Sequence, residues 1–431
     1  MIYSSLRSLL DDLQKKIISS DLESALGLAK LYGNLAWNNH VNIYSAVEIE
    51  DCLFQKLQAL KVLPIIIKSK TNGKILHVLS EGYTTGGHTR VVERLLTENG
   101  ATPFQDVIIV GMCPSEICVK MRNSGANLSF VKLKGISAVN ELSGIMAMYS
   151  SVLLHINPDD IVAALAARAA REAGTKVGLY NHADHCFTYG FSATDIVFEV
   201  SIFGRAISDK YRKKYKWSFA GIPIKAPSLL AEDATGEYFL SSGPGYKYDF
   251  RAGGVFACLL EELIPKSNRK CIIIGPGSLP SDGSEKLTEF IRDGRLLILP
   301  AVKHDVYSRY LKNCFCYIDS APVTGGSALP EAAMLGKPCL GLINPIMGYS
   351  PVDTMRSRTI NELAQKSLAL TMQSTYLPDK LVYEVHAVSN VLNRIRSGLN
   401  GGQCFSIPYG IDAELMNPDL MTLKWTDESI A

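Results

Sequence analysis

Histidines and glycines that follow predicted strands are the residues of this chain best suited to chemistry. The segment SEGYTTGGHTR, residues 80–90, comes directly after an apolar run at residues 75–79 and leads into a predicted helix. An imidazole with an ordinary pKa near ~6.5 can serve as a general base at neutral pH. We therefore expect His88 to accept a proton from a ligand that Gly86 and Gly87 allow close to the backbone. A turn or capping histidine is the structural alternative.

A second histidine cluster stands in the segment NHADHCFTYG, which follows a predicted strand at residues 177–180. Within it, His182 and His185 flank Asp184. Such a cluster can ligate a metal ion, but no further Cys or His cluster nearby completes a tetrahedral set. Histidine-rich loops also bind sugar hydroxyls or serve only in structural hydrogen bonds. We expect these three side chains to contact a ligand or to orient a base, and we expect no metal site.

A glycine turn in the second half of the chain is suited to bind a diphosphate. The sequence VTGGSALPEAAMLGKPC, residues 323–339, follows an apolar run and indicates a turn that opens a helix. Backbone N–H groups and the positive dipole end at a helix start favour phosphate. Glu331, in the first helical turn, is placed to accept hydrogen bonds from a ribose; an ordinary strand–loop–helix connection is the alternative. The predicted diphosphate ligands are Gly325, Gly326, Ser327 and Ala328.

Two further polar side chains follow predicted strands of the same half. Lys247 comes after two glycines in SSGPGYKY, where its ammonium can meet a phosphate as a point charge. A surface lysine is the alternative. His304, in PAVKHDVY, stands at another strand end, and we expect it to lie at the same ligand-binding edge. The chain contains neither a P-loop sequence nor a clear dinucleotide fingerprint.

The elements that position these residues alternate strands with helices over most of the chain. This alternation, with short turns, predicts parallel doubly wound sheets, whose ligands bind at the carboxyl ends of the strands. The predicted fold class is therefore α/β, with two Rossmann-like domains facing a cleft. The predicted strands are residues 75–79, 107–110, 128–131, 151–156, 176–180, 195–200, 238–241, 271–274, 296–299, 314–318 and 339–341.

Changes in periodicity divide the chain into four parts. Leucine stripes at helical spacing predict a small helical cap over residues 1–70. Residues 71–225 and residues 226–400 form the two predicted Rossmann-like domains, joined by a polar, proline-bearing linker. Residues 401–431 are a tail without an assigned structure.

Composition limits the classes of protein that fit this chain. With 47% hydrophobic and 20% charged residues, it is typical of a globular protein, and its net charge of +2 provides no field to recruit nucleic acid. Ten scattered cysteines without a CxxC pair favour a reducing cytoplasm. No apolar run approaches the ~18 residues of a membrane span, so membrane contact would be peripheral, on the inner face. The basic run DKYRKKYKW, residues 209–217, could contact an anionic acceptor or that surface, or form a solvated helix face.

Together these segments resemble the GT-B glycosyltransferases, and above all the inverting branch of O-GlcNAc transferase and the bacterial adhesin-modifying N-glycosyltransferases. SEGYTTGGH is similar to the element that carries the active-site histidine of that branch, and NHADHCFTYG occupies the place of its acceptor and sugar loop. Lys247 matches the lysine that grips the diphosphate. The segment from Gly325 to Pro338 resembles the motif for diphosphate and ribose. The resemblance covers residues 75–342 and extends to bacterial surface-polysaccharide glycosyltransferases.

The resemblance also has departures. The long TPR superhelix of O-GlcNAc transferase is absent, so a protein acceptor is not specifically implied. Retaining GT-B enzymes carry two glutamates seven residues apart, and Val323 stands where the first would be, which favours inversion.

The activity implied by the resemblance is metal-independent transfer of a hexosyl or N-acetylhexosaminyl group. The donor would be a nucleotide-sugar, with UDP favoured and no cofactor; the acceptor would be a hydroxyl of a glycan, a lipid-linked sugar or a protein, in glycan or surface-polysaccharide assembly. His88, Asp184 and His185 would be catalytic. The donor-binding residues would be Gly87, His182, Lys247, His304, Gly325, Gly326, Ser327, Ala328 and Glu331. The alternatives are a nucleotide-sugar epimerase of the same shape and a non-catalytic nucleotide-sugar-binding protein.

Overall fold

The computed structural model describes residues 2–39, 41–61, 71–84, 87–100, 103–212, 215–225, 236–344, 346–370 and 380–411. These residues form two compact units. The first comprises Met1–Pro223 and Val388–Ile407, and the second comprises Ile224–Ala387 with a short segment that begins at Pro408. Gly86, most of the predicted linker and the tail beyond residue 411 lie outside the described residues.

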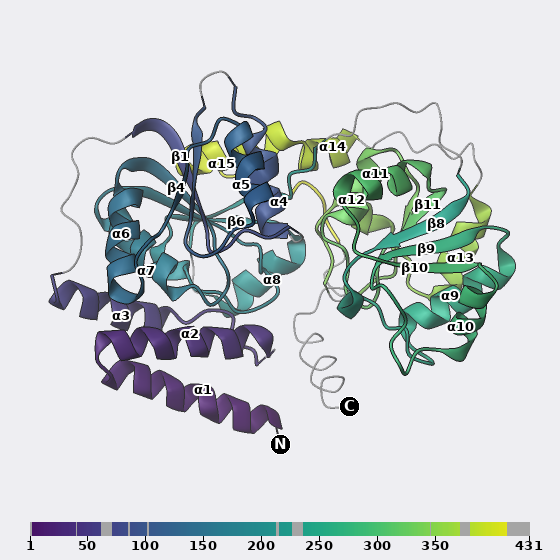
Figure 1. The fold of residues 1–431 in the computed structure, drawn as a ribbon, viewed down its shortest axis with the longest axis horizontal. Coiled ribbons are helices and arrows are strands. Elements are labelled where there is room, and N and C mark those ends of the chain that lie inside the picture. The colour runs from purple at the N-terminus through teal and green to yellow at the C-terminus, as the bar shows by residue number, and fades with distance from the viewer. Residues whose placement is uncertain are drawn as a thin grey trace. The chain divides into compact units, whose positions relative to one another are not determined.

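The first unit is built on a parallel sheet with the strand order β3-β2-β1-β4-β5-β6-β7 (Figure 1). Its strands are β1 (Thr71–Leu79), β2 (Gln105–Ile109), β3 (Leu128–Phe130), β4 (Tyr149–His155), β5 (Lys176–Tyr180), β6 (Ile196–Glu199) and β7 (Trp217–Phe219). Its helices are α1 (Ile2–Ser19), α2 (Leu22–Asn38), α3 (Val47–Ala59), α4 (Gly87–Leu96), α5 (Ser115–Asn123), α6 (Gly135–Ala147), α7 (Ile161–Glu172), α8 (Ile202–Tyr211), α15 (Val388–Leu399) and the 3-10 turn η1 (Phe191–Ala193).

Alternate side chains of these strands line two different cores, because successive residues of a strand point to opposite faces. Leu76 and Val78 of β1 pack in the core that contains α6 and α7. Leu79 packs in a second core with α4 and α5. His77 lies two residues before Leu79 and therefore faces the α4 side of the sheet.

The N-terminal helices belong to the first unit and share its core. Leu26, Leu53 and Phe54 are buried in the same cluster as the sheet residues. Figure 1 shows α1, α2 and α3 stacked on the side of α6 and α7. The predicted helical cap over residues 1–70 is thus an extra layer of this unit in its described part, residues 2–39 and 41–61. None of the described helices combines the length and apolar character needed to cross a lipid bilayer.

The second unit is built on a parallel sheet with the strand order β10-β9-β8-β11-β12. Its strands are β8 (Tyr238–Ser242), β9 (Lys270–Gly275), β10 (Leu296–Pro300), β11 (Cys316–Ile318) and β12 (Cys339–Leu340). Its helices are α9 (Val255–Lys266), α10 (Glu285–Arg292), α11 (His304–Asn313), α12 (Ala328–Met334), α13 (Ile360–Ala369), α14 (Lys380–His386) and the 3-10 turns η2 (Gly245–Lys247) and η3 (Pro351–Met355).

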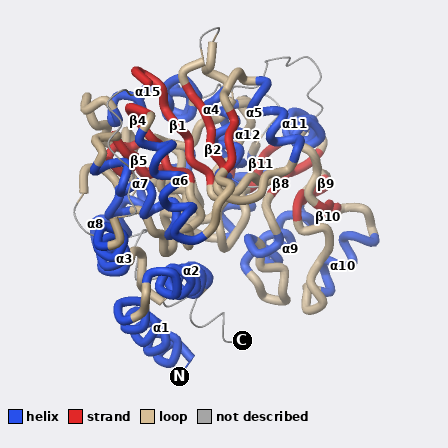
Figure 2. The backbone as a smooth tube through the Cα atoms, turned by 60° about the vertical axis from the view of Figure 1, so that its left-hand side comes forward, coloured by secondary structure: helices blue, strands red, loops and turns tan. Residues whose placement is uncertain are grey.

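Two helical layers cover this sheet (Figure 2). Phe239 packs with α9, α10 and α13, whereas its neighbour Leu240 packs with α11 and α12 on the other face. Two parallel sheets between helices confirm the predicted α/β class.

The structure departs from the prediction near the C-terminus. The sequence predicts one helix over residues 381–395, within the predicted second domain, but α14 ends at His386 and α15 begins at Val388. The chain leaves the second unit between these helices, and α15 packs on β5, β6 and β7 of the first. Leu399 reaches Gly178 of β5, where a Cβ would lie 3.0 Å from its side chain. The predicted end of the second domain at residue 400 is therefore corrected to Ala387.

Candidate functional site

Four histidines gather in the first unit on the α4 side of its sheet. His77 Nδ1 lies 3.0 Å from His155 Nε2, and His155 Nδ1 lies 2.8 Å from His182 Nε2. The His182 ring in turn lies 4.1 Å, centroid to centroid, from the ring of His88 in the first turn of α4. His88 and His182 are both predicted site residues, and the structure brings them into contact.

Burial sets the charge of this cluster. It lowers the pKa of His77 and of His88 to about 4, and that of His182 well below the ordinary value, because a buried imidazolium loses its hydration. The rings are therefore neutral at neutral pH. A neutral imidazole carries one N–H and one lone pair, so each ring can accept a proton.

The loop that precedes His88 is held by side chains on the β4–α7 connection. Ser80 hydrogen-bonds Asp160 and also accepts a hydrogen bond from the backbone N–H of Asn157 (2.8 Å). The Asn157 amide donates to the Tyr83 hydroxyl (3.1 Å), and the Tyr83 N–H donates to Thr89 Oγ1 (2.8 Å). These bonds fix the start of α4. Gly87 begins that helix, and a Cβ at Gly87 would meet open space.

The other two members of the predicted histidine cluster point elsewhere. Asp184 is completely buried, where it accepts a hydrogen bond from Ser201 and lies 3.2 Å from His185 Nδ1. Asp184 can therefore act on a ligand only through His185, whose side chain is 37% exposed. Across the described residues, no three histidine, cysteine or carboxylate side chains gather in a way that could hold a metal ion.

In the second unit, Lys247 reaches the predicted diphosphate turn. Its Nζ donates to the carbonyl of Thr324 (2.7 Å), and Tyr248 pairs with Pro322 in an antiparallel bridge. Burial lowers the pKa of Lys247, although the carboxylate of Asp319 opposes this shift. An ammonium has three N–H donors, so a single carbonyl leaves capacity for an anion. The Lys247 ammonium is thus partly buried and lies against the turn.

One N–H group of the glycine turn already donates a hydrogen bond within the protein. The N–H of Gly325 donates to Asp319 Oδ1 (3.0 Å), so this predicted phosphate donor is already occupied. Among the described residues, no hydrogen bond involves the N–H groups of Gly326, Ser327 or Ala328. Gly326 and Ser327 precede the seven-residue helix α12 and Ala328 begins it; the short dipole of this helix adds little to the direct N–H contacts.

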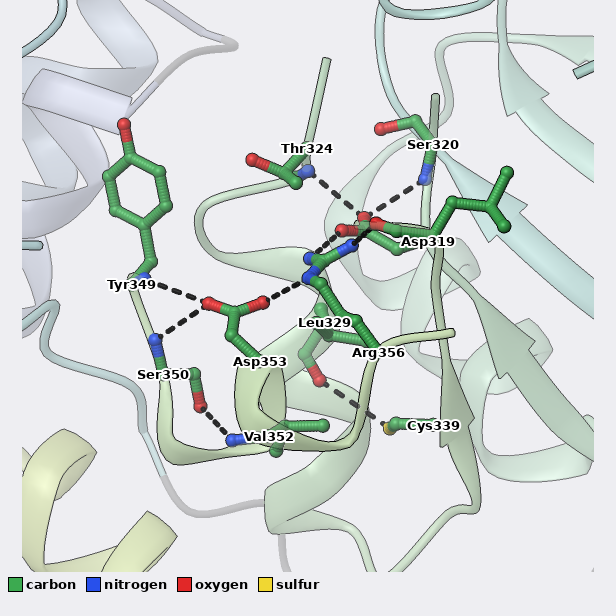
Figure 3. Close-up of polar contacts among 12 residues, drawn as sticks. Asp319, Ser320, Thr324, Leu329, Cys339, Tyr349, Ser350, Val352, Asp353 and Arg356 are labelled. Atoms are coloured by element: carbon green, nitrogen blue, oxygen red, sulfur yellow. Dashed lines mark hydrogen bonds and ion pairs between the residues drawn. The ribbon is translucent and has the colours of Figure 1, made fainter. Parts of the chain in front are cut away.

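A buried ion network beneath the turn was not predicted (Figure 3). Asp319 accepts hydrogen bonds from the N–H groups of Ser320 and Gly325 (both 3.0 Å) and pairs with Arg356 (2.5 Å). Arg356 also pairs with Asp353 (2.6 Å) and donates to the carbonyl of Leu342 (2.9 Å).

Asp353 extends this network to the next loop. Its second oxygen accepts three backbone N–H groups, those of Gly348, Tyr349 and Ser350, at 2.9, 2.8 and 3.1 Å. Every charge in the network has a partner, as a buried ion requires. The network thus fixes the turn to the loop that follows β12.

His304 and Glu331 form a pair in the same unit. His304 Nε2 lies 2.9 Å from Glu331 Oε1, and the two come from α11 and α12. The Glu331 side chain is 8% exposed and that of His304 is 46% exposed. The histidine thus holds the carboxylate that the sequence assigns to a ribose.

Some of these groups had a signal in the sequence. His77 and His155 are polar residues within apolar strands of a parallel sheet, which is itself unusual. Asp319 directly follows the buried strand β11. Asp353 had only the local signal of a capping box that begins at Ser350, whereas Arg356 pairs with Asp319 across 37 positions of sequence.

The basic run at residues 209–217 is not one helix face. α8 ends at Tyr211, and Trp217 begins β7. Arg212 is buried and donates to the carbonyls of Tyr44 and Cys186 (3.4 and 3.0 Å). That charge is internal and does not belong to an acceptor or membrane surface.

No family model and no curated protein sequence matches the chain. Solved structures do match. A glycosyltransferase from Rickettsia africae is 12% identical with a TM-score of 0.55, covering 77% of this chain and 100% of its own. HepE (Alr3699) from Anabaena in complex with UDP is 12% identical with a TM-score of 0.54, covering 76% of this chain and 100% of its own.

A third match is a Listeria monocytogenes protein assigned as a UDP-N-acetylglucosamine 2-epimerase. It is 13% identical with a TM-score of 0.51, covering 77% of this chain and 96% of its own. Identities this low establish a shared architecture only. The chain therefore has the GT-B fold, which it shares with glycosyltransferases and with an enzyme assigned as a nucleotide-sugar epimerase.

Proposed function

We propose that the protein is a glycosyltransferase that moves a hexosyl or N-acetylhexosaminyl group from a UDP-sugar to an acceptor hydroxyl with inversion. The observation that carries this proposal is the partly buried ammonium of Lys247 beside the glycine turn at residues 324–328. A partly buried cation with spare donors favours a bound anion, because an ammonium that loses part of its hydration gains from an opposite charge.

The second unit would hold the donor. Lys247 and the N–H groups of Gly326, Ser327 and Ala328 would contact the diphosphate. Charge builds up on that group as the sugar–phosphate bond breaks, so donors fixed in advance would stabilise the transition state most. Glu331, held by His304, would bind the ribose. In this scheme the protein supplies the positive charge without a metal ion.

The first unit would supply the base. The neutral pair of His88 and His182 would take the proton of the acceptor hydroxyl, while Asp184 would orient His185 toward the sugar or acceptor. The acceptor oxygen would displace the nucleotide in one step, which inverts the anomeric carbon. The acceptor would be a glycan, a lipid-linked sugar or a protein.

The fold also supports an epimerase as a second candidate, because the Listeria protein assigned to that activity shares it. Transfer needs an acceptor, whereas epimerisation does not. A non-catalytic binding protein would bind the donor and leave it unchanged.

Product analysis separates these functions. The protein is first screened with UDP, GDP, CMP and ADP for thermal stabilisation, since a ligand that binds only the folded state raises the melting temperature. The matching nucleotide-sugars are then incubated with and without a glycan acceptor panel. Nucleotide release that depends on an acceptor would support transfer, and an isomerised sugar from the donor alone would establish the epimerase. A bound but unchanged donor would favour a binding protein, and binding of none of the four would contradict the proposal.

A further inference from the structure

The buried histidines form a chain that begins at an amide. Gln105, the first residue of β2, places its Oε1 3.0 Å from His77 Nε2. His77, His155 and His182 then follow one another at 3.0 and 2.8 Å. His77 and His155 are 0% and 1% exposed, so water does not compete for these bonds.

The amide fixes the direction of every hydrogen bond in this chain. Gln105 Nε2 donates to the backbone carbonyl of Leu95 (2.9 Å), which can only accept. Gln105 Oε1 therefore faces His77, and His77 must carry its proton on Nε2. A neutral His77 then accepts at Nδ1, so His155 must donate from Nε2.

The direction of these hydrogen bonds also determines the tautomer of His182, the last of the three rings. His155 accepts at Nδ1, so His182 donates from Nε2 and keeps its lone pair on Nδ1. The two ring nitrogens lie on different sides of an imidazole, and Nδ1 thus faces away from His155. His182 also contacts the ring of His88, the other predicted base.

We propose that Gln105, His77 and His155 are positioning residues that hold His182 in the Nε2–H tautomer, so that His182 Nδ1 takes the acceptor proton. This proposal rests on the proposed function and names the reacting atom of the histidine pair.

The three histidines can account for every proton in this step. The acceptor O–H bond breaks, its proton joins His182 Nδ1, and the oxygen forms the new bond to the sugar carbon while the nucleotide leaves. His182 can pass its Nε2 proton to His155 Nδ1, and His155 can pass its own to His77 Nδ1. The three rings can thus share the excess proton briefly, and His182 Nδ1 releases it to solvent when the product leaves.

Groups around His77 act on its protonated form in both directions. Burial disfavours that form most, whereas the hydrogen bond with Gln105 and the carboxylate of Asp106, which pairs with Lys74 at 3.0 Å, favour it. Tyr180 stacks beside His155 and His182 and donates its hydroxyl proton to the carbonyl of Gly221. His88 is the remaining titratable ring in contact.

Nitrogen-15 NMR of the full protein labelled in its histidine rings tests the tautomer directly. Each ring is assigned by the loss of its signals in a single His→Gln variant. At neutral pH we expect His182 to show a protonated Nε2 and an unprotonated Nδ1. Gln105→Leu removes the acceptor that fixes the direction, so His182 should become a mixture of tautomers.

Two controls keep the result specific. Thr175→Val removes a buried hydroxyl that bonds Met146 and Tyr149 in the same unit, and it should leave His182 unchanged. The backbone amide spectrum shows whether each variant folds. An Nδ1–H tautomer of His182 in the unsubstituted protein, or no response to Gln105→Leu, would overturn the proposal.

Measurements of turnover distinguish failure of the role given to His182 from failure of the transferase assignment. We expect Gln105→Leu to lower kcat at least about tenfold with little change in donor KM, and Thr175→Val to leave both unchanged. If the tautomer follows Gln105 but kcat does not, His182 is not the base, while the transferase assignment stands. If the unsubstituted protein consumes no nucleotide-sugar, the transferase assignment itself fails, and with it the role given to His182.

Discussion

At the scale of single residues, the guanidinium of Arg356 holds the glycine turn in place. It links Asp319, which binds the N–H of Gly325, to Asp353, which binds three N–H groups of the loop at residues 348–350. All three charged side chains are at most 3% exposed. Removal of one partner would leave two buried carboxylates without compensation.

Arg356→Ala should lower the free energy of unfolding by about 3–5 kcal/mol, the usual cost of breaking a buried ion pair. The exposed Arg358, two positions along, is the matched control, and Arg358→Ala should change stability by less than about 0.5 kcal/mol. Urea denaturation followed by circular dichroism measures both. Equal effects of the two substitutions would show that the network does not stabilise the second unit.

Glu50 should give the first unit an unusual dependence on pH. This carboxyl group is 0% exposed and bonds the N–H groups of Gly190 and Ser192, and burial raises its pKa to about 7. The folded state therefore keeps a proton that the unfolded chain releases near pH 4.5. Between these values, the free energy of unfolding should fall as the pH rises, by about 3 kcal/mol in total.

The buried histidines change the pH dependence of the free energy of unfolding in the opposite direction. The folded-state pKa of His77 and of His88 is about 4, so the unfolded state binds more protons below the ordinary value of 6.5, and stability falls as the pH drops. Glu50→Gln isolates the carboxyl contribution. Urea denaturation followed by tryptophan fluorescence reports on Trp37 and Trp217 of the first unit. The difference between the variant and the unsubstituted protein should change with pH across this window; a constant difference would contradict the raised pKa.

At the scale of elements, α2 is docked on the loop that carries Asp159 and Asp160. A Cβ at Gly33 would lie 2.9 Å from the backbone of Asp159 and 2.7 Å from the ring of Tyr189. A Cβ at Gly27, in the same helix, would meet open space. Gly33 therefore permits close packing, whereas no contact among the described residues requires a glycine at position 27.

Gly33→Ala should destabilise the first unit by about 1–3 kcal/mol, because overpacking forces the backbone apart. Gly27→Ala should stabilise it by up to about 1 kcal/mol through helix propensity alone. Urea denaturation followed by tryptophan fluorescence compares them in one helix. Stabilisation by both substitutions would mean that α2 is not tightly packed on the loop.

The sequence predicted the elements well where local pattern decides. Short apolar runs bounded by turns placed β5 at residues 176–180 and β8 from residue 238. It failed where tertiary contacts decide. The break at Ala387 separates two helices that continue one apolar pattern, and only their packing on different units reveals it.

The site was predicted to a similar extent. His88, Lys247 and the glycine turn follow strands, and that position is visible in the sequence. The contact between His88 and His182 depends on strand order, which places β1 beside β4 and β4 beside β5. Gln105 lies 28 positions after His77 in the sequence, so no local pattern reveals their contact.

At the scale of the whole molecule, the chain builds one unit, then a second, and returns to the first. α15 covers β5 to β7, so residues 388–407 complete the first unit, although the prediction assigns residues 388–400 to the second domain and residues 401–407 to the tail. Each unit carries one half of the proposed chemistry, the base in the first and the diphosphate contacts in the second. The central claim is that the second unit binds a nucleotide diphosphate through Lys247.

Titration calorimetry of UDP tests that claim most directly. Lys247→Ala should weaken UDP binding about 10- to 100-fold, since a hydrogen bond to a charged group contributes ~1.5–3 kcal/mol. Lys270→Ala is the matched control, because Lys270 is exposed at the opposite, N-terminal end of its strand in the same unit. The account predicts UDP binding by the unsubstituted protein and by Lys270→Ala, with a marked loss in Lys247→Ala. Equal UDP affinity in all three proteins would contradict it.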